Sequence, residues 1–233
     1  LVHLSRDGGK TWANVTPPQL PAWATLSMID PSRHESGRCY IAVDGHQENI
    51  RDPYLFKTAD YGRSWARIDA GIPRSVLSYT SAIKEDPVRK GLLFAGTANG
   101  IYASFDDGAA WHPLQSNLPQ ACITWIAIQE HFNDLVVGTN GRGCWIMDDI
   151  TPLRVLTPGT GGAAAGAMLL KPREAYRFKE RQSVDRPPND QTRIEPAPYG
   201  AVLHYYLAGA PKGAPLIEIS DGTGRRVRTL RGT

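Results

Sequence analysis

The chain has 233 residues, of which 41% are hydrophobic and 21% charged, so it can bury a sizeable core and is not expected to be disordered throughout. Its 26 Lys and Arg residues against 23 Asp and Glu residues give a net charge of +3, which excludes a whole-chain case for nucleic-acid binding. No apolar run is long enough for a membrane-spanning helix, so membrane insertion is not expected.

Three cysteines, Cys39, Cys122 and Cys144, each lie inside an apolar run. An odd number at wide spacing does not indicate a disulfide scaffold, and no Cys/His spacing typical of a metal site is present. We therefore expect these side chains to be small buried hydrophobic groups, and we expect neither a metal nor a cofactor.

A motif of eight residues occurs three times, at residues 5–12, 58–65 and 104–111. Its pattern is (S/T)-x-D-x-G-x-x-W, and its aspartates lie 53 and 46 residues apart. The shared positions are Ser5, Asp7, Gly9 and Trp12, then Thr58, Asp60, Gly62 and Trp65, then Ser104, Asp106, Gly108 and Trp111. A motif repeated at this distance is typical of repeat architectures.

Each shared position has a physical role in a folded turn. The hydroxyl and the carboxylate can accept hydrogen bonds from N–H groups of a tight turn, and the glycine allows a positive φ. The tryptophan offers a large apolar plate that can wedge between neighbouring sheets. The aspartates could instead bind a metal or act in catalysis, but a group used identically in every repeat is more typical of a structural role.

Short apolar segments bounded by Gly, Pro, Asp and Ser predict strands around the motifs. The first two sets are Thr25–Ile29, Cys39–Val43, Tyr54–Lys57 and Trp65–Ile68, then Ser78–Ile83, Leu92–Gly96, Ile101–Ser104 and Trp111–Leu114. The third set is Ile123–Ile128, Leu135–Gly138, Cys144–Met147 and Leu153–Leu156, with Asp148-Asp149 in place of the motif. Four strands in each roughly 50-residue unit are typical of β-propeller blades.

These sets predict an all-β fold: a partial β-propeller of about three and a half four-stranded blades over residues 1–156. Because Leu1 falls inside a predicted strand and so few blades cannot close a ring, we expect these to be the C-terminal blades of a longer chain. The remaining blades of that chain would then be partners of this segment. An assembly of several short chains is the alternative.

The three motifs resemble the Asp-box, or BNR repeat, of sialidases, sortilin-type (VPS10) ectodomains and xyloglucanase-like glycoside hydrolases. Residues 135–143 (LVVGTNGRG) are similar to the last blade of the xyloglucanase-like members. Over residues 1–156 the resemblance is to large secreted bacterial proteins of the BNR-repeat glycosyl hydrolase type with sortilin-like propellers. It implies a propeller in a secreted, periplasmic or cell-surface protein, and it leaves activity open because such families include enzymes, receptors and assembly factors.

The remaining residues predict a linker and a second β segment. Residues 157–198 are first Gly/Ala-rich and later polar with prolines, with a short extended segment at 168–178 between these parts. Residues 199–233 predict strands at Ala201–Leu207, Leu216–Ser220 and Arg226–Leu230, the last two joined by an Asp221-Gly222-Thr223-Gly224 turn. This hairpin resembles the start of the Ig-like module of flagellar-hook-cap (FlgD-type) proteins, which implies an incomplete Ig-like domain.

In a propeller, the loops from outermost to innermost strand and from second to third strand share one face, which we call the loop face. Its loops are residues 16–24, 44–53, 70–77, 97–100, 115–122 and 139–143. The longest loop of the second-to-third kind contains the carboxylates Asp44, Glu48 and Asp52, with His46 and Arg51. The carboxylates could bind a sugar or cation, or form an acid/base pair with a carboxylate from another blade. Alternatively, the segment is a solvated loop with a local Arg51–Asp52 or Arg51–Glu48 ion pair.

Two further candidates lie in the Gly-rich turn of residues 139–143. Asn140 and Arg142 are candidate ligand-binding residues; Arg142 could bind an anion, or it could hydrogen-bond carbonyl groups of an adjacent blade. A glycoside hydrolase needs two carboxylates at about 5–9.5 Å across the scissile bond, and no such pair can be identified from the sequence.

The resulting functional prediction is a secreted or cell-surface propeller module, non-catalytic by itself, that binds a protein, peptide or polysaccharide through its loop face. The alternative is a fragment of a xyloglucanase-like or sialidase-like glycoside hydrolase whose main catalytic carboxylates lie in other blades. A third interpretation is a purely structural module of a multidomain surface protein.

Overall fold

A computed structural model describes residues 1–156, 166–175 and 200–232, in two compact units, Leu1–Arg154 and Val155–Thr233. Most of the predicted linker over residues 157–198 lies outside the described residues. No helix in the described part of the chain is long and apolar enough to cross a membrane.

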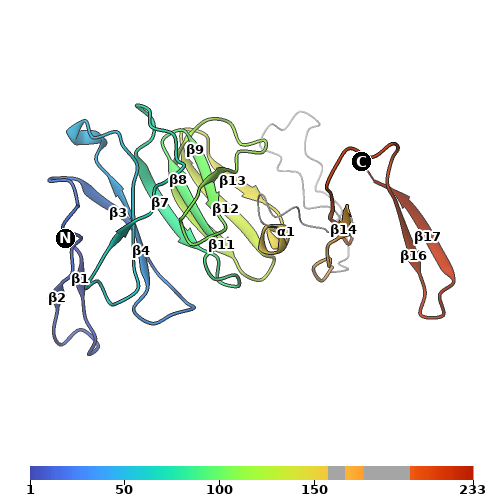
Figure 1. Ribbon diagram of the computed structural model, residues 1–233, viewed down its shortest axis with the longest axis horizontal. Helices are drawn as coiled ribbons and strands as arrows, with labels where there is room; N and C mark the ends of the chain where they lie inside the picture. The colour runs from blue at the N-terminus through green and yellow to red at the C-terminus, as the bar shows by residue number, and fades with distance from the viewer. Residues whose placement is uncertain (157–165, 176–199, 233) are drawn as a thin grey trace, which may run out of the picture. The chain divides into compact units, whose positions relative to one another are not determined.

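The first unit consists of successive antiparallel sheets that follow one another along the chain (Figure 1). A two-stranded pair, β1 (His3–Leu4) and β2 (Ala13–Asn14), comes first. The next sheet has the order β3 (Thr25–Pro31), β4 (Cys39–Asp44), β5 (Tyr54–Thr58) and β6 (Ala66–Arg67). Then come β7 (Thr80–Glu85), β8 (Leu93–Thr97), β9 (Gly100–Ser104) and β10 (His112–Pro113), followed by β11 (Cys122–Gln129), β12 (Asp134–Asn140) and β13 (Cys144–Met147).

Neighbouring sheets pack face to face and share their core. Strands β4 and β3 contact β7, and β11 contacts β7 and β8. Every residue of β8, Leu93–Thr97, is buried, because this strand lies between β7 and β9 in its own sheet and packs against β11 of the next sheet. Sequential four-stranded antiparallel sheets stacked in this way are the blades of a β-propeller, so the predicted all-β, propeller-type fold is confirmed.

The sheet of β11, β12 and β13 lacks the fourth strand that the sequence predicted. Leu153–Leu156 was predicted as a strand, but the chain instead forms the helix α1 (Thr151–Val155). The carboxylate of Asp149 accepts hydrogen bonds from the Thr151 amide (3.2 Å) and hydroxyl (2.6 Å), and Pro152 falls in the first turn, where its missing N–H costs nothing. Arg154 then anchors the helix by pairing with the buried Asp86 at 2.9 Å.

The three repeated turns share the same two hydrogen bonds to backbone amides. The hydroxyl of Ser5, Thr58 or Ser104 accepts from the glycine amide four residues later, at 2.7, 2.9 and 2.9 Å. The carboxylate of each aspartate accepts from the amide four residues later, at 2.9 Å in all three turns. The glycines Gly9, Gly62 and Gly108 have φ of 90°, 78° and 86°. The sequence motif therefore specifies one local structure.

Two of the three motif tryptophans contact the preceding sheet. The Trp65 indole N–H donates to the carbonyl of Val15 at 2.7 Å, and that of Trp111 donates to the carbonyl of Ile68. Trp111 is 4% exposed. Trp12, by contrast, is 63% exposed, and its indole donates to Gly9 within its own turn. The expected wedge thus forms at Trp65 and Trp111.

The cysteines are less buried than expected. All three thiols are free; Cys39 and Cys122 are half-buried, and Cys144 is exposed. Along β13 the side chains alternate between exposed and half-buried, and Cys144 falls on the outward positions. The expectation of a buried Cys144 is therefore wrong, because an apolar run in this strand has one uncovered face.

The second unit contains two antiparallel strand pairs. Strand β14 (Ala167–Leu169) pairs with β15 (Tyr205–Leu207), and β16 (Leu216–Ser220) pairs with β17 (Arg226–Arg231). The strand expected over Ala201–Leu207 is thus limited to its last three residues. In the β16–β17 turn, the Asp221 carboxylate accepts from the Arg225 amide at 3.0 Å. Part of the extended segment expected at 168–178 lies outside the described residues.

Candidate ligand-binding sites on the first unit

The loop between β4 and β5 is shaped by local contacts. The Asp44 carboxylate accepts a hydrogen bond from the His46 amide at 2.9 Å, and the short 3-10 helix η1 (His46–Glu48) follows. Asn49 then reverses the chain with φ of 58°, a left-handed conformation that asparagine tolerates. An ideal Cβ on Gly45 would lie 2.8 Å from Ile50, so only glycine fits at the start of this loop.

Two side chains of this loop meet Tyr79, which immediately precedes β7 in the next sheet. The imidazole of His46 stacks on the Tyr79 ring with centroids 4.8 Å apart and an angle of 26°. The guanidinium carbon of Arg51 lies 5.7 Å from the centre of the same ring. A cation at this distance is attracted to the ring face. Tyr79 is therefore the point on which the loop converges.

The remaining members of this group lie on the two flanking sheets. The Asp44 carboxylate binds the Nδ1 atom of His46 at 2.7 Å, so the Nε2 edge of the imidazole is the edge left for a ligand. On the other side lies Cys122, the first residue of β11, which is close enough to Tyr79 for each side chain to affect the pKa of the other. We call Asp44, His46, Arg51, Tyr79 and Cys122 the Tyr79 cluster.

The Cys122 thiol and the Tyr79 phenol of the Tyr79 cluster are both neutral near pH 7. Burial raises the pKa of the Tyr79 phenol, and burial likewise raises the pKa of the Cys122 thiol. The Arg51 guanidinium and the Asp44 carboxylate supply the permanent charges of the cluster. This composition suits recognition by hydrogen bonds and stacking better than attack by a thiolate.

The structure separates the other predicted residues. Asp52 forms an ion pair with Arg74 at 3.1 Å, and not with Arg51 as one of the two predicted pairs would have it. Glu48 is exposed. The three candidate carboxylates thus have different surroundings. Asn140 is brought near the Tyr79 cluster, because it is the register partner of Cys122 in the β11–β12 ladder.

Arg142 lies in a turn held by its backbone. The Arg142 amide donates to the Thr139 hydroxyl at 3.1 Å, and its carbonyl accepts from the Trp145 indole at 2.9 Å. The residue itself is exposed. Within residues 1–156, 166–175 and 200–232, no group of three or more His, Cys, Asp or Glu side chains is arranged to hold a metal ion.

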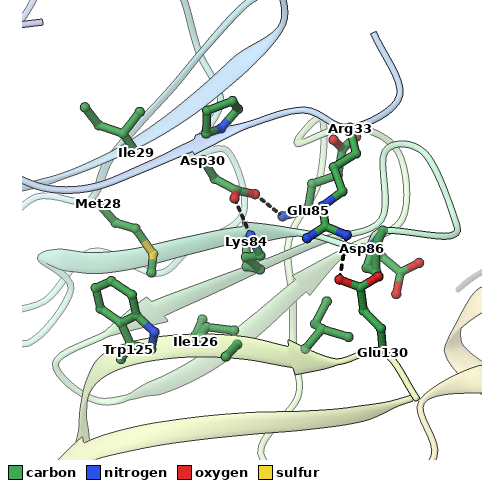
Figure 2. A pocket seen from close by; sticks show the side chains of 14 residues that line it. Met28, Ile29, Asp30, Arg33, Lys84, Glu85, Asp86, Trp125, Ile126 and Glu130 are labelled. Atoms are coloured by element: carbon green, nitrogen blue, oxygen red, sulfur yellow. Dashed lines mark hydrogen bonds and ion pairs between the residues drawn. The ribbon is translucent and has the colours of Figure 1, made fainter. Parts of the chain in front are cut away.

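A second candidate site lies along the inner strands β3, β7 and β11 (Figure 2). Its cavity has a volume of about 290 Å³. Trp125 and Met28 lie at one end, and the ion pair of Arg33 with Glu130 lies at the other. We call this cavity the inner groove. The sequence did not reveal it, because its lining comes from three segments distant in the chain, although Trp125, the one aromatic residue of β11, was an available signal.

No family model matches the chain, and no curated protein matches it in sequence. A solved GH74 enzyme from Niastella koreensis has 15% identity and a TM-score of 0.42, covering 53% of this chain and 21% of that chain. YCF48 bound to D1 peptide has 18% identity and a TM-score of 0.46, covering 62% and 42%. The GH74 xyloglucanase from Xanthomonas campestris has 14% identity and a TM-score of 0.43, covering 53% and 22%. This chain spans less than half of each of these proteins, and likeness at this level assigns neither an activity nor a ligand.

Proposed function

We propose that the chain is a non-catalytic binding module that holds a protein, peptide or polysaccharide on its loop face, centred on the Tyr79 cluster. The observation that carries this proposal is the convergence of His46 and Arg51 on Tyr79, a residue of the next sheet. Contacts across sheets fix these side chains on a rigid scaffold, as recognition requires.

The chemistry of the cluster supports a polar, extended ligand. The guanidinium of Arg51 can donate hydrogen bonds, the Nε2 atom of His46 accepts in the tautomer whose Nδ1–H bonds Asp44, and the Asn140 amide can both donate and accept. Hydroxyl groups of a sugar and backbone groups of a peptide match this set equally well. The proposal therefore includes both a polysaccharide and a peptide ligand, and the binding experiment distinguishes between them.

We further propose that the repeated turns are Asp-boxes, that the module functions outside the cytoplasm, and that its blades belong to a longer propeller. The corresponding domain limits are residues 1–156 for the blades, 157–198 for a linker and 199–233 for an Ig-like segment. The shared hydrogen bonds of the three turns support the Asp-box assignment, and the β16–β17 hairpin supports a second β segment after the blades.

The alternative is a glycoside hydrolase fragment, which requires a pair of carboxylates at about 5–9.5 Å. The carboxylates of the loop do not favour it, since Asp44 is bound to His46 and Asp52 to Arg74. Turnover of xyloglucan or aryl glycosides by this chain, lost in Asp44→Asn or Glu48→Gln, would overturn the proposal of a non-catalytic module.

The binding test uses a glycan array that includes xyloglucan oligosaccharides, and a peptide array. We expect a ligand from one array whose affinity falls about tenfold in the double variant Arg51→Ala, Tyr79→Ala, because truncation of an aromatic and an arginine at the centre of an interface has effects of this size. The matched control is Arg6→Ala, because Arg6 makes a similar contact with Tyr61, 4.0 Å from the ring centre, away from the loop face. Equal losses in both variants, or no ligand on either array, would contradict the proposal.

A further inference from the structure

The sheet of β11, β12 and β13 ends on an open edge, and β13 is its last strand (Figure 1). In the described part of the chain β13 pairs only with β12, and no other strand lies along its free side. The two preceding sheets each continue into a short fourth strand, β6 or β10. An unpaired strand edge presents N–H and C=O groups that can pair with another chain. The free edge of β13 is therefore a candidate interaction surface.

The register shows which backbone groups of β13 face this edge. The Thr139 amide donates to the Gly143 carbonyl at 3.1 Å, so these two residues form a hydrogen-bonded pair. Such pairs alternate with non-bonded pairs along an antiparallel ladder. Trp145 therefore bonds to β12, whereas the N–H and C=O groups of Cys144 and Ile146 point away from β12. The backbone groups of these two residues are the ones that an added strand would bind.

This edge also lacks the features that usually protect strand edges from association. The fourth strands of the two preceding sheets have only two residues each, and they contain Arg67 in β6 and Pro113 in β10. Strand β13 has four residues, Cys-Trp-Ile-Met, with no charge and no proline. Short length, charge and proline all discourage pairing with another chain. The composition of β13 is instead typical of an inner strand.

The contacts between the preceding sheets show what a fourth strand brings with it. The Trp65 indole donates to the Val15 carbonyl at 2.7 Å, and the Trp111 indole donates to the Ile68 carbonyl. Leu114 is the next member of this series. The amides of Val15, Ile68 and Leu114 each donate at 2.9 Å to the carbonyl 13 residues earlier, which belongs to Val2, Leu55 and Ile101 in turn. A fourth strand on β13 would therefore place its tryptophan at Leu114.

The place at Leu114 is open. Among the described residues no hydrogen bond is donated to the Leu114 carbonyl, and this residue is half-buried, whereas the equivalent Ile68 is 5% exposed. A recess of about 30 Å³ remains there, lined in part by Leu114 and Trp145. The Trp145 indole donates to Arg142 and so does not reach Leu114. Trp65 stays half-buried in its own contact, so the recess need not enclose a whole indole.

We propose that the free edge of β13 binds an extended segment of another protein as a fourth strand, with a tryptophan of that segment seated at Leu114. This occupant continues a contact that the molecule already makes twice between its sheets, at Trp65 and Trp111. An extended peptide on a sheet edge gains affinity from main-chain hydrogen bonds and specificity from a pocket for a side chain. The proposal does not depend on the loop-face proposal, because no residue of the Tyr79 cluster belongs to β13.

A second copy of this chain suits the place less well. Its three motif tryptophans already donate hydrogen bonds within that copy, Trp12 to Gly9, Trp65 to Val15 and Trp111 to Ile68. To act as the wedge, one of them would have to leave its present acceptor.

The test uses a fluorescein-labelled synthetic peptide of residues 62–70 (GRSWARIDA), which contains Trp65 and the fourth strand β6. Fluorescence anisotropy measures its binding to the whole chain. We expect saturable binding that falls about tenfold when alanine replaces the tryptophan of the peptide. Phenylalanine at this position should cause a smaller loss, because it keeps an aromatic ring without the N–H donor.

Ile146→Pro tests the edge itself. Proline removes the outward N–H of residue 146 and leaves the hydrogen bonds between β12 and β13 in place, so we expect binding to weaken about tenfold without unfolding. The matched control is Ile146→Val, which keeps the backbone donor and should bind as the parent does. Circular dichroism checks that both variants are folded.

Modified peptides test the same pairing without changing the protein. In β6 the Ile68 amide donates to β5, so by alternation the amides of Ala66 and Ile68 face the neighbouring strand and that of Arg67 faces away. N-methylation of the peptide at residues 66 and 68 should abolish binding, whereas N-methylation at residue 67 should change it little. If Ile146→Pro does not fold, this pair of peptides decides the question.

Equal affinity of the two N-methylated peptides would refute the proposal, as would equal affinity of Ile146→Pro and Ile146→Val or the absence of saturable binding. Sedimentation velocity of the chain alone tests the other occupant. A dimer that disappears in Ile146→Pro, without any binding of the peptide, would assign the edge to a second copy and refute the proposal of a separate protein.

Discussion

The first and third repeated turns share one motif and the same hydrogen bonds to backbone amides, yet their tryptophans differ greatly in burial. Trp111 is 4% exposed and bonds to the preceding sheet, whereas Trp12 is 63% exposed and bonds within its own turn. The motif therefore determines the turn, and the neighbouring sheet determines how much the turn contributes to stability. Recurrence of a motif does not imply recurrence of its energetic role.

The largest test of this comparison truncates the two tryptophans. Trp111→Ala removes a buried indole and its hydrogen bond to Ile68, so we expect the free energy of unfolding of the first unit to fall by about 3–5 kcal/mol. Trp12→Ala removes a mostly exposed side chain, and a change of at most about 1 kcal/mol is expected. Urea denaturation followed by circular dichroism measures both.

Similar losses in the two tryptophan variants would contradict the comparison, because they would show that the turn itself carries the stability. The conservative variants Trp111→Phe and Trp12→Phe separate area from hydrogen bonding, since phenylalanine keeps an aromatic ring without the N–H donor.

The repeat pattern predicted most of the fold because its signals are local. The turn motif and the strand alternation around it depend on neighbouring residues, and the strands from Thr25 to Met147 lie close to their predicted positions. The helix α1 was missed because Asp149 and Thr151 form a cap before a stretch whose apolar residues suit a strand equally well. Exposure of Cys144 was missed because it depends on what covers the sheet.

The candidate sites were predictable in part. The loop with Asp44, His46 and Arg51 was noted for its density of polar groups, and the structure brings these three together. Tyr79 as their meeting point depends on how two sheets pack. The inner groove is lined by residues of three sheets, such as Met28 and Trp125. These residues are far apart in the sequence, so no local pattern could predict that they lie together.

A second, smaller effect is expected from the glycines of the same two turns. An ideal Cβ on Gly108 would lie 2.8 Å from Ile68 of the preceding sheet, whereas on Gly9 the nearest atom would be 3.8 Å away, in Trp12. Both residues have positive φ, so alanine costs about 1–2 kcal/mol of backbone strain in each. Gly108→Ala should cost about 1–3 kcal/mol more than Gly9→Ala, because it also overpacks the contact between sheets.

Thermal or urea unfolding of the two alanine variants measures this difference. A Gly9→Ala loss equal to that of Gly108→Ala would show that backbone strain alone accounts for both glycines. Ile68→Val in the Gly108→Ala background provides a further check, since a smaller neighbour should recover part of the loss if steric overlap is its cause.

The smallest expected effect is on the dependence of stability on pH, and here the first and second turns should behave alike. Hydrogen bonds from the Thr11 side chain hold the pKa of Asp7 at about 2, and hydrogen bonds from the Ser64 side chain do the same for Asp60, against an ordinary value of 3.8. A carboxyl whose pKa is lowered in the folded state stabilises it above the unfolded value, and this contribution is lost as the pH falls from about 4 to 2.

Asp7→Asn and Asp60→Asn should therefore each flatten the dependence of unfolding free energy on pH between about 4 and 2, and by similar amounts. The similarity is the informative part, because Trp65 of the second turn contacts the preceding sheet and Trp12 of the first does not. Chemical denaturation at a series of pH values measures the slopes. A much larger change in Asp60→Asn would mean that the neighbouring sheet, and not the local hydrogen bonds, sets the acidity of these carboxyl groups.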